Sequence, residues 1–316
     1  MATPASAPNP IKEAANIIAA EDDTDVFMYN AEIKRPYDRE LFDLCGKRIR
    51  RKNVALILAS EGGDPDAAYR IARCFQEHYD RFTCVIPGYC KSAGTIIAIG
   101  AHELMMSDAA ELGPIDVQMS KRDELEEWQS GLTLTSAIRA LHEHSFAAFE
   151  HFFLTTMQRS KKRVTFKTAT DIAAKLTAGL FGPVFQHIDP MMVGESFRAT
   201  SIALHYGVRL DMHSENLLED SLDFLISKYP THGFVIDRAE AENLFKRVKK
   251  PGKAYETLID ALEETAYDPL SGNAEIRSFL SDQREEEEDR HGDNEEANTG
   301  ETVPRSQSRT LAPAAD

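Results

Sequence analysis

The feature that most constrains the fold is a run of seven residues, Asn-Val-Ala-Leu-Ile-Leu-Ala, at positions 53–59. Apolar and polar residues do not alternate along it, which is typical of a strand buried on both faces of a parallel sheet. A Gly-Gly pair follows at 62–63, and Pro65 stands where helices often begin. The inward face of that helix carries Ala68, Ile71, Ala72 and Phe75. This stretch therefore predicts a strand followed by a crossover helix.

The same order of strand, turn and helix recurs around Ser92. A predicted strand at 82–86 ends at Pro-Gly, the chain turns through small residues, and a second apolar run begins at Thr95. A third, short strand is expected at 103–107. This alternation predicts an α/β fold with a parallel sheet of βαβ units and right-handed crossovers, followed by a mainly helical C-terminal part.

Two candidate functional segments fall at one edge of this sheet. Ligands of parallel sheets bind beyond the carboxyl ends of the strands, and both Gly62-Gly63 and Ser92 come shortly after a strand. The turn at Ser92 also leaves helix N-terminal amides free to meet negative charge. Serine is a common helix N-cap as well, so its surroundings have to decide between a cap and a functional hydroxyl.

The composition excludes several classes of protein. The 316 residues carry 36 Lys and Arg against 52 Asp and Glu, without the basic patch of a nucleic-acid-binding protein. The four cysteines show no zinc-ligand spacing, and we expect reduced thiols, no metal and no cofactor. No apolar run reaches the length of a membrane span, and the N-terminus lacks the pattern of a secretory signal. We therefore expect a cytoplasmic protein.

Four segments are expected along the chain. Residues 1–24 are Ala/Pro-rich and then acidic, and we expect a flexible N-terminal arm or a docking helix. Residues 25–250 form the main domain, and residues 251–280 a helical extension. Residues 281–316 hold 11 acidic and 4 basic residues, which predicts a disordered acidic tail. The helices expected in the C-terminal half are 133–159, 170–177, 190–206, 214–228 and 237–247.

The residues at this edge could support acyl transfer. Glycines lack Cβ and permit close approach, so the Gly62-Gly63 pair could offer amides to an oxyanion, together with the amide of Ala93. A serine nucleophile at position 92 would also need a base, and the base an orienting group.

Short motifs carry a resemblance to a known family over roughly residues 54–240. They are Ser60-Glu61-Gly62-Gly63-Asp64-Pro65, Lys91-Ser92-Ala93-Gly94-Thr95, Glu111-Leu112-Gly113-Pro114-Ile115-Asp116, Ile188-Asp189-Pro190 with Gly194-Glu195, and Thr231-His232-Gly233. With them the chain resembles the Clp/crotonase superfamily of serine peptidases. Within it the chain is most similar to the serine dehydrogenase proteinase (SDH) family, which is related to signal peptide peptidase A. The resemblance implies a Clp/crotonase-like serine-type endopeptidase domain at 25–250, a polypeptide substrate and a homo-oligomer.

The resemblance also implies residue roles. Ser92 would be the nucleophile, and Gly63 with Ala93, beside Gly62, would form the oxyanion hole. Clp peptidases carry their histidine about where Asp116 lies here, so their usual order of catalytic residues is broken. The SDH family has the order Ser, Asp, His, which would make Asp116 the orienting acid and a later histidine the base. His232 matches that position best.

Alternatives stay open for each of these residues. His187, which precedes Ile188-Asp189-Pro190, is the second candidate base. Asp116 is equally a turn residue that binds its own backbone, and Gly62-Gly63 could be a plain turn between strand and helix. A serine–lysine dyad is a further variant in the superfamily, but Lys91 adjoins Ser92 and should point away from it, while Lys121 has no special context.

Two other functions compete with peptide hydrolysis. Crotonase relatives use two backbone amides to hold an acyl-CoA thioester enolate and need no serine. A catalytically dead module that only assembles into oligomers is the second rival.

Overall fold

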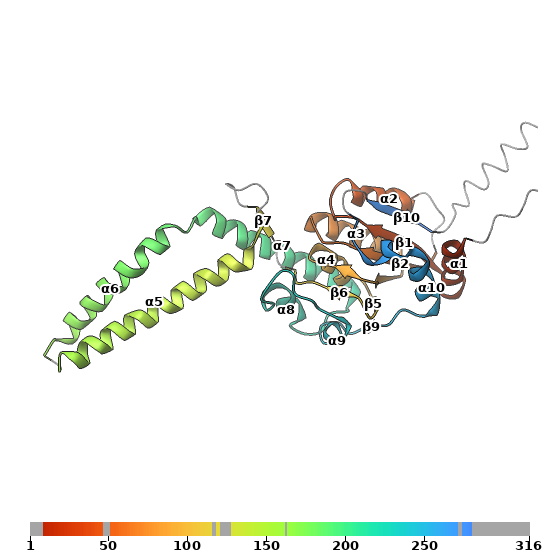
Figure 1. The fold of residues 1–316 in the computed structure, drawn as a ribbon. Coiled ribbons are helices and arrows are strands. Elements are labelled where there is room, and N and C mark those ends of the chain that lie inside the picture. The colour runs from red at the N-terminus through yellow and green to blue at the C-terminus, as the bar shows by residue number, and fades with distance from the viewer. Residues whose placement is uncertain are drawn as a thin grey trace, which may run out of the picture.

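The centre of the molecule is a six-stranded sheet with the order β10-β1-β2-β3-β5-β9 (Figure 1). The computed structural model describes residues 9–46, 51–115, 118–120, 128–161, 163–270 and 274–279. The strands are β1 (Thr24–Asn30), β2 (Asn53–Ala59), β3 (Arg81–Ile86), β5 (Glu103–Met106), β9 (Val248–Lys249) and β10 (Glu275–Ser278). All neighbours are parallel except β10, which pairs antiparallel with β1. The predicted α/β fold class is confirmed.

Two βαβ units form the middle of the sheet. Helix α3 (Pro65–His78) connects β2 to β3, and α4 (Ala93–Ile99) lies between β3 and β5. Every residue of β2 after Asn53 is buried, as its unbroken apolar sequence predicts. The predicted inward face of α3 is also correct, because Ala68, Ile71, Ala72 and Phe75 are all buried. The Gly-Gly pair follows the carboxyl end of β2, and the turn before α4 follows that of β3. Both segments therefore lie at the same edge of the sheet.

Helices cover both faces of the sheet. One face packs against α2 (Tyr37–Gly46), α3 and α4, and the other against α1 (Pro10–Asp22), α10 (Lys253–Leu262) and α11 (Glu264–Tyr267). Residues 10–22, expected as a flexible arm or a docking helix, form α1, which buries Ala14, Ala15, Ile18 and Ala19. The predicted C-terminal extension contains β10 in addition to its helices, and residues 281–316 lie outside the described residues.

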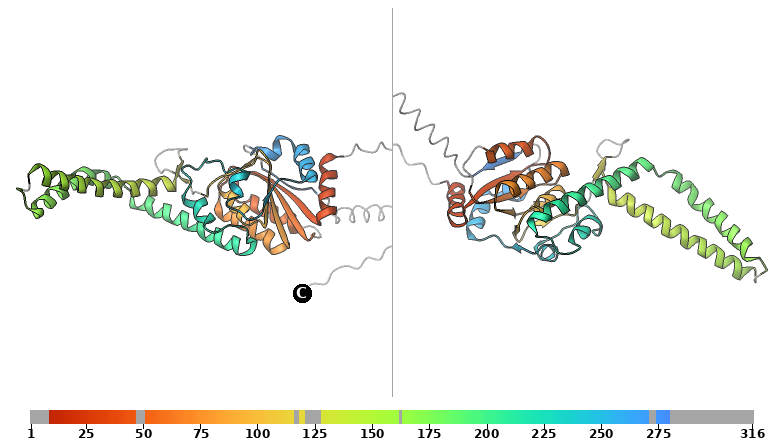
Figure 2. Two further views of the ribbon diagram at one scale, coloured as in Figure 1. Left: turned by 90° about the horizontal axis from the view of Figure 1, so that it is seen from below. Right: turned by 180° about the vertical axis from the view of Figure 1, so that it is seen from behind.

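A helical arm projects from this body (Figures 1 and 2). It consists of α5 (Gly131–Arg159), α6 (Phe166–Gln186) and the first turns of α7 (Pro190–Ser214), whose last turns pack on α3 and α4. The helices expected at 133–159 and 190–206 are present, and the one expected at 170–177 is longer than predicted. None of the described helices combines the length and the apolar character needed to cross a membrane.

The helix predicted at 214–228 is wrong in its first half. Glu215 ends α7 in the left-handed conformation, and the next helix, α8 (Ser221–Ser227), begins only after a loop. Asp237 caps α9 (Arg238–Ala241), because its side chain accepts a hydrogen bond from the amide of Glu240. That helix is shorter than expected, because the chain must extend into β9.

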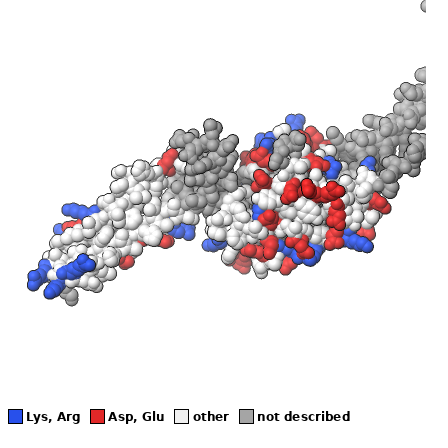
Figure 3. All heavy atoms as spheres, viewed as in Figure 1, with Lys and Arg blue, Asp and Glu red and all other residues white. Residues whose placement is uncertain are grey.

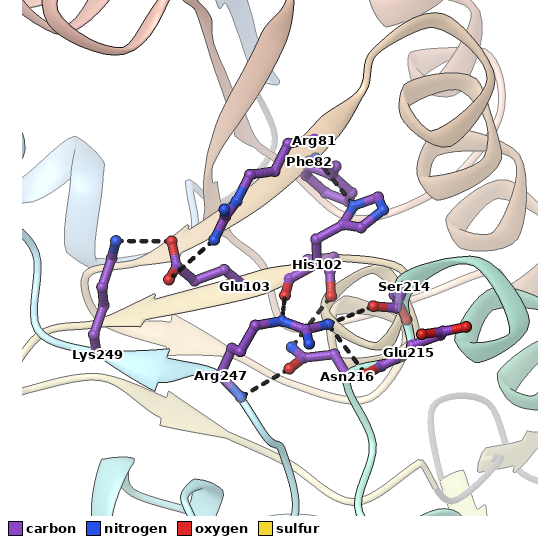
Figure 4. A network of polar contacts seen from close by, with 10 residues as sticks. Arg81, Phe82, His102, Glu103, Ser214, Glu215, Asn216, Arg247 and Lys249 are labelled. Atoms are coloured by element: carbon purple, nitrogen blue, oxygen red, sulfur yellow. Dashed lines mark hydrogen bonds and ion pairs between the residues drawn. The ribbon is translucent and has the colours of Figure 1, made fainter.

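Arg247 fixes the end of α7 to the sheet. Its guanidinium donates to the carbonyls of His102, Ser214 and Glu215, and its backbone amide donates to the side chain of Asn216 (Figure 4). Asn216 in turn donates to the carbonyl of Ala101. Because these partners belong to α7, the β5 region and β9, the arm has a rigid root.

Four further short strands are present among the described residues. Strands β4 (Tyr89–Cys90) and β6 (Glu111–Leu112) pair in parallel beside the turn at Ser92. Strands β7 (Gln118–Ser120) and β8 (Trp128–Ser130) form an antiparallel pair directly before α5.

Candidate active site

Ser92 occupies a strained turn between β4 and α4. The amide of Gly94 donates to the carbonyl of Lys91 over 2.8 Å, and Ser92 has φ 51° and ψ −111°. These are the dihedrals of the second residue of a type II′ turn, which glycine normally occupies. A serine there costs about 1–3 kcal/mol. Its hydroxyl makes no cap hydrogen bond to α4, so the interpretation of Ser92 as an ordinary helix cap does not hold.

The Gly-Gly pair lies directly against this turn. Ser60, at the end of β2, exchanges backbone hydrogen bonds of 2.9 Å with Tyr89 and Lys91. Gly62 follows with φ 110°, and a Cβ built on it would lie 2.7 Å from the Ser92 Cβ. A Cβ on Gly63, at φ 137°, would collide with the carbonyl of Ile33. The two turns therefore approach one another as closely as glycine allows.

Some backbone amides at this junction donate a hydrogen bond within the chain, and others do not. The Gly62 amide donates to the Ser60 hydroxyl over 3.1 Å, so Gly62 contributes close approach and not a donor. The amide of Ile33 donates to the carbonyl of Gly62, and the carbonyl of Ile33 accepts from the amide of Asp64. In this strand-like pairing the amide of Gly63, between them, points away from Ile33. Within the described part of the chain, the amides of Gly63 and Ala93 have no hydrogen-bond acceptor. Two such donors beside a serine are what an oxyanion hole requires.

Lys91 joins three segments beneath the turn. Its side chain is 3% exposed, and its Nζ lies 2.6 Å from Glu111 Oε2. The same Nζ donates to the carbonyls of Leu112, at 3.1 Å, and Phe234, at 3.3 Å. The prediction that Lys91 points away from Ser92 agrees with these partners. Its role is to hold the neighbouring segments in place.

His232 lies in one of the segments that Lys91 holds. The loop from α8 to α9 passes the turn at Phe234 and then pairs with Leu112 through Ile236, with backbone distances of 2.9 and 3.0 Å. His232 is half-buried and two residues before Phe234. Among the described residues the Ser92 hydroxyl makes no hydrogen bond, so a base would have to approach it on substrate binding.

The other described histidines belong to other parts of the molecule. His187 is exposed at the end of α6, on the arm. His78 lies at the end of α3 and binds the carbonyl of Cys74. His102 accepts from the amide of Phe82, and burial together with Arg247 and Arg81 lowers the pKa of His102. Of the two candidate bases, only His232 is on a loop that contacts a neighbour of Ser92.

Asp116 lies outside the described residues, but the chain leading to it is placed. Thr95, in the first turn of α4, donates through its hydroxyl to the carbonyl of Gly113 over 2.7 Å. Ile115 is buried, and its amide donates to the carbonyl of Leu225 in α8 over 2.9 Å. The segment before Asp116 is therefore hydrogen-bonded both to α4, which follows Ser92, and to α8, which precedes the loop that carries His232.

Sequence reasoning missed the residues that assemble the site. Ser60 orients the Gly62 amide, Lys91 and Glu111 join the segments, and Thr95 holds Gly113. All four residues lie within the motifs quoted above, and that was the only available signal. The contact of Ser60 with Gly62 is local, whereas the contacts of Lys91 and Thr95 join positions 18 to 143 residues apart, which no local pattern could reveal.

The cysteine next but one to Ser92 is buried, which disfavours thiol chemistry at this site. Cys90, two residues from Ser92, is fully buried, and burial raises the pKa of its thiol to about 12, which keeps it neutral and unreactive. Burial also raises the pKa of the Cys84 thiol. The described residues contain no cluster of His, Cys, Asp or Glu side chains suited to a metal ion.

Known proteins resemble parts of the chain. Residues 47–125 match the family described as ClpP-like SDH-type serine proteinases. One uncharacterized protein of Methanocaldococcus jannaschii is 30% identical over 130 residues, 40% of this chain and 44% of its own length. A second from the same organism is 36% identical over 70 residues, 22% of this chain and 24% of its own. The chain thus spans less than half the length of these relatives.

Two solved structures of the 1510-N membrane-bound stomatin-specific protease are also similar. One, in complex with a substrate peptide, is 14% identical and has a TM-score of 0.42, covering 84% of this chain and 91% of its own. The other is 16% identical with a TM-score of 0.29, covering 47% and 68%.

The matched segment contains Gly62, Gly63, Ser92 and Ala93 and ends just beyond Asp116. The resemblance found in the sequence is thereby confirmed, and residues 47–125 are similar to the ClpP-like SDH-type serine proteinases.

Proposed function

We propose that this chain is a cytoplasmic serine endopeptidase that hydrolyses peptide bonds through an acyl-enzyme on Ser92. The observation that carries the proposal is the conformation of Ser92. Ser92 is a non-glycine residue held at φ 51° and ψ −111°, and its partly exposed side chain makes no capping hydrogen bond. Strain of this kind is characteristic of nucleophiles on a sharp turn between strand and helix.

In the proposed reaction His232 takes the Ser92 Oγ proton while Oγ attacks the carbonyl carbon of a polypeptide. The negative charge that develops on the carbonyl oxygen is held by the amides of Gly63 and Ala93, which have no acceptor among the described residues. The imidazolium then gives its proton to the departing amine. Water, deprotonated by His232, releases the acyl group and restores the hydroxyl.

The remaining residues support this geometry. Gly62 lets the two turns approach, and Asp116 would orient His232 and stabilise the imidazolium. Lys91 holds both the segment before Asp116 and the loop after His232. The match to a serine proteinase family over residues 47–125 supports the same reaction class.

The test is Ser92→Ala, with Ser201→Ala on the exposed face of α7 as the matched control. We expect Ser92→Ala to abolish covalent labelling by a fluorophosphonate probe and to reduce hydrolysis of fluorescein-labelled casein by at least about 10³-fold. Ser201→Ala should keep both activities. Unchanged hydrolysis by Ser92→Ala would contradict the proposal. Absence of labelling in the unaltered protein, with thermal stabilisation by an acyl-CoA, would favour the crotonase-type reaction instead.

A second pair of variants identifies the base. His232→Ala should lower the labelling rate by about 10²–10⁴-fold, because an unassisted serine hydroxyl is a weak nucleophile. His187→Ala, on the arm, should label at the normal rate. The reverse outcome would transfer the role of base to His187.

A further inference from the structure

A pocket of about 570 Å³ lies between α8 and α9 and takes no part in the proposed hydrolysis. Its volume is within the roughly 300–1,000 Å³ of pockets that bind small ligands. The described residues that line it combine an apolar wall with three carboxyl groups and include no lysine, arginine or histidine. They include Phe224, Tyr229 and Leu244 on the apolar side and Glu219, Asp237 and Glu240 on the acidic side. The pocket therefore suits a ligand with an apolar stem and a positively charged end.

The three carboxyl groups form no ion pair with a described basic side chain. Lys228 and Arg238 adjoin two of the lining residues in the sequence, but both have other partners. Lys228 pairs with Asp223 at 3.5 Å, and Arg238 pairs with Asp108 at 2.8 Å. A cleft lined by charges of one sign raises the local concentration of ions of the opposite sign. A cation that enters this pocket would meet the carboxylates without displacing a partner within the described part of the chain.

The wider surface of the body has the same sign of charge. The chain carries 52 Asp and Glu against 36 Lys and Arg. Figure 3 shows acidic side chains spread across the body, whereas basic side chains gather at the far end of α5 and α6. A field of this sign attracts cations and repels anions. We therefore expect a cationic ligand, and not a phosphate or a carboxylate.

Ser221 adds a buried hydroxyl to the pocket. It begins α8, is 2% exposed and lines the pocket. Its hydroxyl has no hydrogen-bond partner among the described residues, although buried hydroxyls normally have one. A serine hydroxyl accepts hydrogen bonds from N–H groups. A ligand that carries several N–H donors would supply that partner.

Two hydrogen bonds hold the acidic groups in place. The Tyr229 hydroxyl donates to Glu240 Oε1 over 2.7 Å, and the amide of Glu240 donates to Asp237 Oδ1 over 2.8 Å. Burial, and then the bond to Glu240, raise the pKa of the Tyr229 hydroxyl, so it remains a donor. Glu240 Oε2 and Asp237 Oδ2 have no hydrogen-bond partner among the described residues. Acceptors held in this way lose little freedom when a ligand binds.

A guanidinium group fits these features better than an ammonium group. It is planar, and its five N–H donors can bind several carboxylate oxygens at once. It also stacks on aromatic rings, which Phe224 and Tyr229 provide here. Because it is more weakly hydrated than an ammonium, it enters partly apolar surroundings more readily.

We propose that this pocket binds an alkylguanidinium group, the chemistry of an arginine side chain. The carboxylates of Glu219, Asp237 and Glu240 neutralise the charge, and the Ser221 hydroxyl accepts one N–H group. Both a small alkylguanidine and an arginine within a polypeptide carry this group. Free arginine is disfavoured, because its own carboxylate would be brought among like charges.

The pocket includes both ends of the loop that carries His232. Tyr229 lines the pocket at one end of this loop and Asp237 at the other. The ring of Tyr229 packs against that of Phe234, with centroids 4.8 Å apart, and the Phe234 carbonyl accepts from Lys91. A guanidinium bound between the two ends would hold them together.

Isothermal titration calorimetry of the full chain tests the site, with Ser92→Ala protein so that the peptide stays intact. The probes are an acetylated and amidated Gly-Arg-Gly peptide, the same peptide with citrulline in place of arginine, and agmatine. We expect the arginine peptide to bind with a dissociation constant of about 0.1–1 mM. The citrulline peptide, which has the same shape without the charge, should bind at least about tenfold more weakly. Equal binding of agmatine would identify a small alkylguanidine as sufficient, and tighter binding of the peptide would identify arginine within a polypeptide.

Variants of the lining residues test which groups hold the ligand. Asp237→Asn/Glu240→Gln should weaken binding of the arginine peptide about tenfold or more, while asparagine still caps α9. Ser221→Ala should weaken it about threefold to tenfold, the effect of one hydrogen bond. Glu242→Gln, exposed on the turn after α9 and outside the pocket, is the matched control and should bind as before.

Three results would overturn the proposal. They are equal affinities for the arginine and citrulline peptides, an unchanged affinity in Asp237→Asn/Glu240→Gln, and no binding of the arginine peptide up to about 10 mM. Thermal unfolding shows whether each variant keeps its fold, and Glu219→Gln, in the exposed turn before α8, gives the same comparison if the double variant does not. Because all proteins carry Ser92→Ala, failure here is separable from failure of the peptidase assignment.

Discussion

The turn at Ser92 and the helical arm differ in how many of their side chains and backbone groups find partners within the chain. Around Ser92, the side chains of Lys91 and Thr95 and the backbones of Ser60 and Gly62 find partners within a few ångströms. On the arm, many large apolar side chains are exposed, and α6 buries only Ala169 and Ala173. The first region is complete within one chain, whereas the second has an open face.

The difference predicts how each region responds to change. In the body a small added volume must displace backbone, because the interior is close-packed. On the arm the same volume enters open space. Equivalent substitutions in the two regions should therefore differ in size and even in sign.

The largest effect is expected for Gly62→Ala. The new Cβ would lie 2.7 Å from the Ser92 Cβ at a backbone φ of 110°, so both turns must move. We expect a loss of about 2–3 kcal/mol in the free energy of unfolding and a fluorophosphonate labelling rate reduced at least about 100-fold. Urea denaturation and labelling measure the two. Normal labelling in a folded variant would show that the close approach is not required.

Lys91→Met should have the next largest effect. It removes the partner of the Glu111 carboxylate and of the Phe234 carbonyl, whereas the Leu112 carbonyl keeps its hydrogen bond from the amide of Ile236. Because Glu111 is 26% exposed and can rehydrate, we expect about 2 kcal/mol of destabilisation, below the cost in a dry interior. Lys91→Met/Glu111→Leu should recover much of this stability, since both charges are then removed.

The control for Lys91→Met is Lys52→Met. Lys52 pairs with Asp80 over 3.8 Å with both side chains mostly exposed, and its replacement should cost less than about 0.5 kcal/mol. Equal costs for the two lysines, measured by urea denaturation, would refute the role of Lys91 in joining three segments.

Gly179→Ala, the arm counterpart of Gly62→Ala, should have the opposite sign. Gly179 lies inside α6, and no atom is within 4 Å of a Cβ built there. Alanine should stabilise the helix by about 0.5–1 kcal/mol. The change in melting temperature at low protein concentration reports this. A destabilised Gly179→Ala would show that the surroundings of Gly179 are closed.

The smallest effect concerns pH. Burial, with Arg247 and Arg81 nearby, lowers the pKa of His102 in the folded state, while the unfolded chain takes up its proton near pH 6.5. Below about pH 6.5 the unfolded state therefore binds more protons, and stability falls as pH falls. The denaturation midpoint should drop between pH 7.5 and 5.5 by less in His102→Asn than in the unaltered protein. His187→Asn, on the arm, is the matched control.

Local patterns predicted the centre of the fold and the position of the candidate nucleophile after a strand. The unbroken apolar run at 53–59, the face of α3 and the small residues around Ser92 all belong to short stretches of chain. The βαβ order follows from them, because connections between parallel strands obey a fixed handedness. The end of α7 at Glu215 and the pairing of β10 with β1 could not be predicted in this way, since both depend on distant contacts.

The sequence by itself determined the central strands β2, β3 and β5, the crossover helix α3 and which hydroxyl follows a strand, because short-range sterics and apolar periodicity encode them. Only the tertiary structure decided that Ser92 is a strained turn residue and not a cap, and that the Gly62 amide is already used. It also decided that Lys91 joins segments up to 143 residues apart. The physical reason is that hydrogen-bond partners and open faces are set by what the rest of the chain brings alongside.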